Sequence, residues 1–200
     1  PFYAPNTETR TELLVQELKT NGLCDLFFMQ EMWNTNHFDH FQHLMNIDFG
    51  EQTLLLRADD IRQDELKSGL VSVTKSPAQN PFSFLYAINK DGIADDIREG
   101  FGVHKGFTTF DIKMAGGTIN SLNTHLHQAS VPVRLAQLTQ LHQALLASHG
   151  YTVPWIFTGD LNFRPYSLEW QFLTKVMGFR DSYDEIAADK NACTYCAENP

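Results

Sequence analysis

The sequence predicts an α/β fold in which two β-sheets pack against each other and helices lie outside them. Helical patterns alternate with short apolar runs of strand length along the 200 residues, and two of these runs flank a turn typical of a hairpin. Strands in hairpins, mixed with helices at both ends of the chain, favour sheet packed on sheet. Because a chain of this length buries one substantial core, residues 1–200 are expected to form a single domain.

The first part of the chain alternates helices with strands. Residues 9–19 are predicted to be helical because their leucines fall on one face. The run DLFFMQE at 25–31 is predicted to be a strand buried on both faces. A helix is predicted over 36–45, and short strands over 53–57 (TLLLR) and 69–74 (GLVSVT).

The middle of the chain predicts a hairpin followed by a long helix. A strand over 82–88 (FSFLYAI) precedes two further strands, 106–113 and 117–125, which flank the sequence MAGG. The glycines of MAGG supply the turn that a hairpin needs. A helix is predicted over 131–147, where leucines recur at three- and four-residue spacings.

The last predicted strand ends in two polar side chains. It covers 154–160 (PWIFTGD), is also expected to be buried on both faces, and is followed by a predicted helix over 168–177. Because side chains alternate across a strand, Asp160 and Asn162 are predicted to share one face, with Leu161 on the other.

Two other strands end in the same way. Asn123, His125 and His127 share a predicted face at the end of the hairpin, and Glu31 closes an almost wholly apolar strand. Polar residues at strand ends are where loops build sites on a rigid scaffold. A Glu can ligate Mg²⁺, which prefers oxygen and keeps several waters, and a His can donate to a phosphate oxygen or move a proton. An Asp/Asn pair can hold a water or a phosphoryl oxygen.

Each candidate residue also has a purely structural interpretation. Asp160 and Asn162 can cap a turn, because Asp and Asn form hydrogen bonds to nearby backbone. Glu31 can be a solvated strand end. Four others are compatible with a solvated surface position: Lys105, His127, Arg134 and Gln137.

The composition restricts the class of function. A net charge of −9 disfavours a DNA-coating protein, whose affinity rests on Lys and Arg. It allows an enzyme that meets a phosphodiester through a metal ion, because the metal brings its own positive charge. No apolar run reaches the roughly 18 residues of a transmembrane segment, and no signal-peptide pattern opens the chain. Localisation stays open.

The three cysteines form no complete disulfide framework. Cys24 precedes an apolar strand and is expected to be a buried small hydrophobic residue. Cys193 and Cys196 have the spacing C-x-x-C, which fits half a zinc site, a disulfide or two unrelated thiols. No second Cys/His pair accompanies them, so zinc is disfavoured and the redox compartment stays open.

Five segments occur in an order typical of one superfamily. They are FFMQEMW (27–33), SGLVSVTKSP (68–77), HKGF (104–107), NTHLHQASVPVRLAQLTQL (123–141) and FTGDLNFRP (157–165). Together they resemble the endonuclease/exonuclease/phosphatase superfamily, whose fold is that of DNase I and the neutral sphingomyelinases. The tail at 179–200, FRDSYDE followed by CTYCAENP, resembles the sphingomyelinase-type branch. The resemblance implies a DNase I-like four-layer sandwich, with two packed mixed sheets flanked by helices.

The resemblance also implies chemistry for five residues. Glu31 would ligate Mg²⁺, for which Mn²⁺ can substitute; His125, Asp160 and Asn162 would be catalytic; Lys105 would contact the substrate phosphate. The implied function is metal-dependent hydrolysis of a phosphodiester, with a phospholipid such as sphingomyelin favoured over nucleic acid and with peripheral membrane contact. A DNase I-like nuclease, and a non-catalytic family member or binding module, are the alternatives. The oligomeric state stays open.

Two segments of the family have no counterpart in this chain. The family begins with a strand that ends in an asparagine and closes with an S-D-H segment whose histidine acts as general base. This chain begins with PFYAPNTETR and ends with CAENP. We therefore expect a fold that is incomplete at both ends, with the general base absent from these residues.

Overall fold

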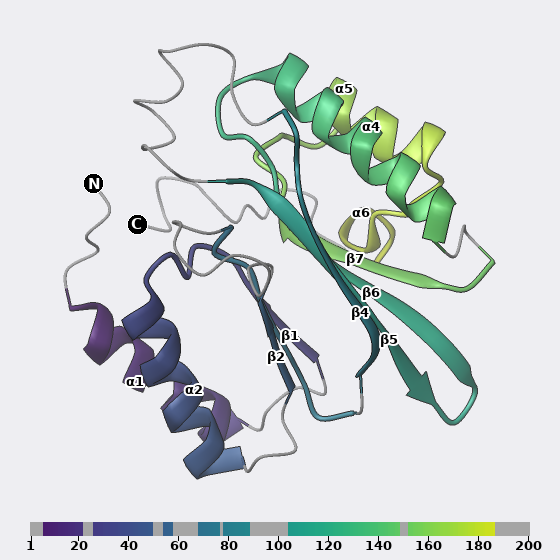
Figure 1. The fold of residues 1–200 in the computed structure, drawn as a ribbon. Coiled ribbons are helices and arrows are strands. Elements are labelled where there is room, and N and C mark those ends of the chain that lie inside the picture. The colour runs from purple at the N-terminus through teal and green to yellow at the C-terminus, as the bar shows by residue number, and fades with distance from the viewer. Residues whose placement is uncertain are drawn as a thin grey trace.

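Two β-sheets lie against each other between two layers of helices (Figure 1). The computed structural model describes residues 6–21, 26–49, 54–57, 68–76, 78–88, 104–148 and 152–186. Cys24, Cys193, Cys196 and the CTYCAENP tail lie outside the described residues. The predicted class, two packed sheets with helices outside them, is confirmed.

The first sheet has three strands in the order β1-β3-β2. β1 (Leu26–Met29) and β2 (Leu54–Arg57) each pair antiparallel with β3 (Val71–Thr74). Two helices, α1 (Thr7–Asn21) and α2 (Thr35–Phe49), cover this sheet on its outer side (Figure 1). The predicted strand at 53–57 and both predicted helices are confirmed for the described residues, with Thr53 lying outside them.

The alternation of side chains in β3 separates the layers. Val71 and Val73 pack into a core with the apolar side chains of α1 and α2. Ser72 points the other way, and its hydroxyl lies 3.2 Å from that of Thr108 in the second sheet. The interface between the sheets is therefore partly polar, whereas the interface between sheet and helices is apolar.

The second sheet has four strands in the order β4-β5-β6-β7. β4 (Ala78–Leu85), β5 (Gly106–Met114) and β6 (Gly117–His125) are antiparallel neighbours, and β5 and β6 form the predicted hairpin. β7 (Trp155–Asp160) pairs parallel with β6. The chain crosses from β6 to β7 through α4 (Val131–Ser148), which packs its leucines on this sheet.

Three short helical segments follow β7. The predicted helix at 168–177 begins as α5 (Leu168–Gln171) and continues as a π-helix, η1 (Phe172–Val176), where the Met177 N–H reaches the Phe172 carbonyl at 3.0 Å. α6 (Ser182–Ile186) was not predicted, since its five residues are too few to show a helical pattern.

The strand predicted at 82–88 is displaced toward the N-terminus. β4 begins at Ala78 and ends at Leu85, with an irregular register between Gln79 and Phe82. Pro81 lies in this stretch, and β4 can contain it because the described sheet has β4 at its edge, where a bulge and a proline are tolerated.

The strands β1 and β7 were predicted to be buried on both faces, and this is wrong. The residues of β1 are only half-buried, and Ile156 in β7 is 41% exposed. β7 has one strand neighbour in the described part of its sheet, so one of its edges is not covered by another strand there. Among the described helices, none is long and apolar enough to cross a membrane.

Candidate active site

Strand register brings three of the predicted site residues to one end of the second sheet. β6 and β7 are parallel and pair His125 with Asp160 at their carboxyl ends. β5 is antiparallel to β6, and its first residue, Gly106, pairs with His125. Lys105 therefore enters β5 at the same end. Residues separated by 20 and 35 positions in the sequence meet because three neighbouring strands start or finish there.

Two glycines beside these residues allow the strands to approach closely. Gly159, before Asp160, has φ +150°, and a Cβ there would lie 2.0 Å from the Thr124 carbonyl oxygen. Gly106, after Lys105, leaves the same kind of space, since a Cβ would lie 2.3 Å from the Phe84 carbonyl oxygen. A glycine is therefore required sterically after Lys105 and before Asp160.

Lys105 and His125 form a buried polar pair. The two residues are 4% and 1% exposed, and Lys105 Nζ lies 2.9 Å from His125 Nε2. Burial, followed by the positive charge of Lys105, lowers the pKa of His125 to about 3. The imidazole is therefore neutral at pH 7, and the interpretation of Lys105 as an ordinary solvated lysine is wrong.

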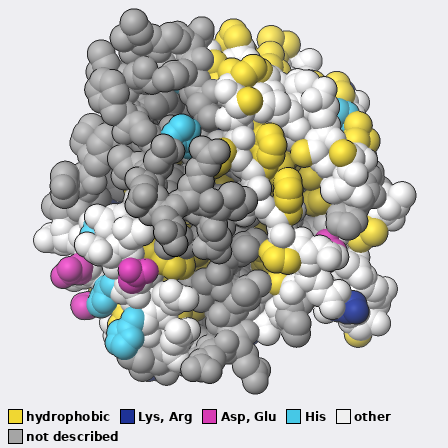
Figure 2. Space-filling view, in the orientation of Figure 1, with side chains coloured by type: hydrophobic (Ala, Val, Ile, Leu, Met, Phe, Trp, Pro, Cys, Tyr) yellow, Lys and Arg dark blue, Asp and Glu magenta, His cyan; other side chains and the backbone are white. Residues whose placement is uncertain are grey.

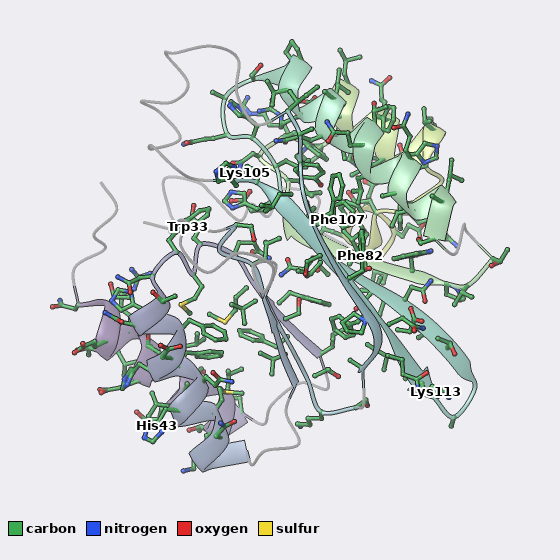
Figure 3. The ribbon with its side chains drawn as sticks, viewed as in Figure 1. Trp33, His43, Phe82, Lys105, Phe107 and Lys113 are labelled. Atoms are coloured by element: carbon green, nitrogen blue, oxygen red, sulfur yellow. The ribbon has the colours of Figure 1, made fainter. Side chains whose placement is uncertain are left out.

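The indole of Trp33 covers this pair from the first sheet's side. Its ring centroid is 5.4 Å from Lys105 Nζ and 5.8 Å from the ring of His125 (Figure 3). An ammonium over an indole face is a favourable cation–π geometry. Gly69, in the S-G-L segment, makes room for the indole, because a Cβ there would lie 2.8 Å from it. Sequence reasoning missed Trp33, although it lies two residues after Glu31 in the quoted motif.

Asp160 faces both a turn and His125. Its Oδ1 accepts a hydrogen bond from the Asn162 N–H at 3.1 Å, which is the turn-capping role considered for it. Its Oδ2 lies 3.6 Å from His125 Nε2, beyond hydrogen-bond length. The Asp160 side chain is 46% exposed, so its carboxylate is open to solvent on the side away from His125.

The parity argument for Asn162 is wrong. β7 ends at Asp160, and Asn162 has φ +52°, so the alternation of a strand no longer applies to it. Its side chain is held by Nδ2, which donates to the Leu126 carbonyl at 2.9 Å. Asn162 thus links the ends of β7 and β6, and this hydrogen bond leaves its Oδ1 for other contacts.

Glu31 lies beyond the end of β1, at the other side of the cluster. Its side chain is exposed, and its backbone has φ +66°, a left-handed conformation that few residues other than glycine adopt. Gln30 donates to Asn123 Oδ1 at 2.7 Å, and the tilted ring of Trp33 lies against that of His125. The segment carrying Glu31 is therefore held next to the end of β6.

The donor set at Glu31 fits a Mg²⁺ site of the open kind. In the described parts of the chain, no group of three or more His, Cys, Asp and Glu side chains is arranged as a metal cage. Mg²⁺ is commonly held by one or two carboxylates, with waters and substrate phosphate completing its shell. An exposed Glu31 carboxylate supplies an oxygen ligand of that type.

Arg134, Gln137 and His127 are buried, and their interpretation as surface residues is wrong. Arg134 donates to the carbonyls of His127 and Gln128, each at 3.0 Å, and Gln137 accepts from the His127 N–H at 2.9 Å. His127 Nδ1 in turn accepts from the Ser130 N–H at 2.9 Å. These contacts brace the turn that follows His125.

The sequence carried a signal for this brace. Arg134 and Gln137 fall on the same helical face as the buried leucines of α4. Arg134 also pairs with Glu169 at 2.7 Å, with both side chains buried. Burial opposes the charged form of Glu169, but hydrogen bonds from its own backbone and from Arg134 outweigh it, and the pKa of Glu169 is lowered.

The arrangement of two packed sheets and outer helices is the DNase I-like fold of the endonuclease/exonuclease/phosphatase proteins. Beta toxin from Staphylococcus aureus superposes with a TM-score of 0.67 at 17% identity, covering 88% of this chain and 66% of that one. The human Nocturnin catalytic domain superposes with a TM-score of 0.65 at 18% identity, covering 90% and 67%. At these identities the likeness shows the fold.

Curated relatives resemble the chain in sequence along its whole length. It is 23% identical to mouse "Sphingomyelin phosphodiesterase 2" over 210 aligned positions, covering 100% of the chain and 48% of the relative. It is 22% identical to the "Putative neutral sphingomyelinase" of Drosophila melanogaster, covering 98% and 44%. The chain thus spans about half the length of these relatives. No known family profile matches it. The similarity to the neutral sphingomyelinase branch, expected from the motifs, is confirmed.

Proposed function

We propose that the protein to which this chain belongs is a Mg²⁺-dependent phosphodiesterase that hydrolyses a phospholipid such as sphingomyelin. The observation that carries the proposal is the convergence of Lys105, His125 and Asp160 at one sheet end, with the Glu31 segment held beside them. The names of the curated relatives supply the substrate class. A beta toxin structure with bound magnesium ions, similar in fold, supports the choice of metal.

His125 would act as a neutral hydrogen-bond donor. A neutral imidazole carries one N–H and one acceptor nitrogen, and Lys105 Nζ lies 2.9 Å from Nε2 and 3.4 Å from Nδ1, within reach of whichever nitrogen accepts. The positive charge at this sheet end then belongs to Lys105, whose ammonium would stabilise negative charge developing on a phosphoryl group. Lys105 would also hold the ring of His125 in one orientation.

Asp160 and Asn162 would orient the attacking water. Asp160 offers an exposed carboxylate whose other oxygen is fixed by the turn, so its direction is set before substrate arrives. Asn162 would contribute its Oδ1, since Nδ2 donates to the Leu126 carbonyl and fixes the direction of the amide. Mg²⁺ held by Glu31 would polarise a phosphoryl oxygen and stabilise charge on the leaving group.

The described surface favours a lipid over a nucleic acid. Of the three cations that could line a nucleic-acid groove, Lys105 and Arg134 are buried, and Arg164 is exposed. Figure 2 shows hydrophobic side chains gathered on the β4 and α4 side of one face, and no band of Lys and Arg among the described atoms of that face. Phe82, Leu85 and Ile88 are among the exposed apolar residues. This surface chemistry also suits peripheral contact with a membrane.

The test compares Mg²⁺-dependent hydrolysis of sphingomyelin and of plasmid DNA by the full-length protein. We expect sphingomyelin hydrolysis, and a fall in kcat of about 100-fold or more in His125→Gln and in Asp160→Asn. His43→Gln and Asp39→Asn, on the exposed face of α2, are matched controls that should retain full activity. Hydrolysis of DNA in place of lipid would establish the nuclease alternative, and no Mg²⁺-dependent activity would establish a non-catalytic protein.

A further inference from the structure

Asn123 belongs to β6, but its side-chain amide is bound entirely to the other sheet. Its Nδ2 donates to the carbonyl oxygens of Met29, at 3.0 Å, and Val71, at 3.2 Å. Its Oδ1 accepts from Gln30 Nε2 at 2.7 Å. Both donors and the acceptor are thus used in a side chain that is 0% exposed. This amide fixes the end of β1 against β6, two residues before His125.

The same contacts fix one side of Glu31, and other contacts fix its other side. Gln30 precedes Glu31 and is held by Asn123. Met32 follows it, and the Met32 N–H donates to the Gly69 carbonyl at 3.0 Å. Glu31 itself has φ +66°, a conformation that persists in a residue other than glycine only where the surroundings impose it. The backbone of Glu31 is therefore clamped between two anchored neighbours.

We propose that Gln30 and Asn123 are positioning residues that hold the Glu31 carboxylate in place for a divalent cation. The inference rests on the proposed function, in which Glu31 binds the metal. Residues that orient a metal ligand without touching the metal commonly change metal affinity by about 10- to 100-fold when they are replaced. If the Gln30–Asn123 hydrogen bond served only the packing of the two sheets, its removal would change stability and leave metal affinity unchanged.

The test measures Mn²⁺ affinity by electron paramagnetic resonance titration of the full-length protein without substrate. Gln30→Met keeps the length of the side chain and removes its hydrogen-bonding group. Gln140→Met is the matched control, because Gln140 also makes a side-chain hydrogen bond, in which its Oε1 accepts from the Ala87 N–H at 2.9 Å on another part of the fold. We expect Gln30→Met to weaken Mn²⁺ binding by about tenfold or more and Gln140→Met to leave it unchanged.

Three further variants, Glu31→Gln, Asn123→Ala and the double variant, separate the failure of this inference from that of the proposed function. Mn²⁺ binding that is lost in Glu31→Gln but unchanged in Gln30→Met would overturn the positioning role alone. Absence of any Glu31-dependent binding in the unchanged chain would overturn the metal site, and the positioning role with it. Asn123→Ala combined with Gln30→Met should weaken binding no more than the stronger single change, because the pair acts as one unit. If Asn123→Ala does not fold, the comparison of Gln30→Met with Gln140→Met decides the question.

Discussion

The two sides of the candidate site are built in different ways. On the second sheet, Lys105 and His125 are buried, and strand pairing places them with Asp160. On the first sheet, Glu31 is exposed and lies past the end of its strand, in a strained backbone conformation held by neighbouring residues. One side is thus fixed by the fold itself. The other depends on a few specific side-chain contacts and is easier to alter without loss of the fold.

The largest effect is expected where strand pairing is tightest. In Gly159→Val, the added Cβ would lie 2.0 Å from the Thr124 carbonyl oxygen. The variant would also force a β-branched residue to adopt φ +150°. We expect this variant to lack a cooperative unfolding transition by circular dichroism. Gly116→Ala in the β5–β6 turn has open space around it and should unfold like the unchanged chain. A normal transition in Gly159→Val would show that the β6–β7 pairing can adjust.

The next effect concerns the brace behind His125. Arg134→Met leaves Glu169 charged and buried, so the free energy of unfolding should fall by about 3–5 kcal/mol in urea titrations. The double variant Arg134→Met with Glu169→Leu should recover much of this loss. Arg180→Met, which removes the exposed Arg180–Glu185 pair, should cause no measurable change. If Arg134→Met and Arg180→Met lowered the free energy of unfolding equally, the buried pair would not be stabilising the turn behind His125.

The third effect is a dependence of stability on pH. The pKa of His125 is lowered to about 3, so its neutral form stabilises the fold fully above the unfolded-state pKa of about 6.5. As the pH falls from there toward about 3, that contribution is lost at roughly 1.4 kcal/mol per pH unit. In urea titrations without divalent cations, the free energy of unfolding should fall less between about pH 6.5 and pH 4.5 in His125→Gln than in the unchanged chain. The same slope in both chains would show that His125 titrates normally.

The smallest effect is expected on the exposed side of the site, with the opposite sign. Glu31→Gly relieves the left-handed strain at φ +66° and should raise the free energy of unfolding by about 0.5–1 kcal/mol, while Mn²⁺ binding is lost. As a control, Gln16→Gly in the exposed part of α1 should lower the free energy of unfolding by about 1 kcal/mol, because glycine is a poor helix former. Destabilisation by Glu31→Gly would mean that the Glu31 side chain supports the fold.

The buried side of the site could be predicted from sequence, and the exposed side only in part. The glycine turn of the hairpin located β6, an apolar run located β7, and alternation within β6 put Asn123 and His125 on one face. Alternation failed for Asn162, because the chain leaves the strand at Asp160 and backbone dihedral angles beyond a strand are not encoded in its period. The contacts of Asn123 with Gln30 and of Trp33 with His125 cross between sheets, so no local pattern reports them.

The parallel pairing of β6 with β7 also bears on how the protein folds. The β5–β6 hairpin closes through a short turn, so the contact of Lys105 with His125 needs only local chain closure. Asp160 reaches His125 only after the chain has passed through α4, which imposes a longer loop and a slower step. We therefore expect Asp160 to join the site late, so that pulse-labelled amide exchange during refolding shows protection in β5 and β6 before β7. During synthesis, the contact between Lys105 and His125 would form before the Asp160 carboxylate reaches them.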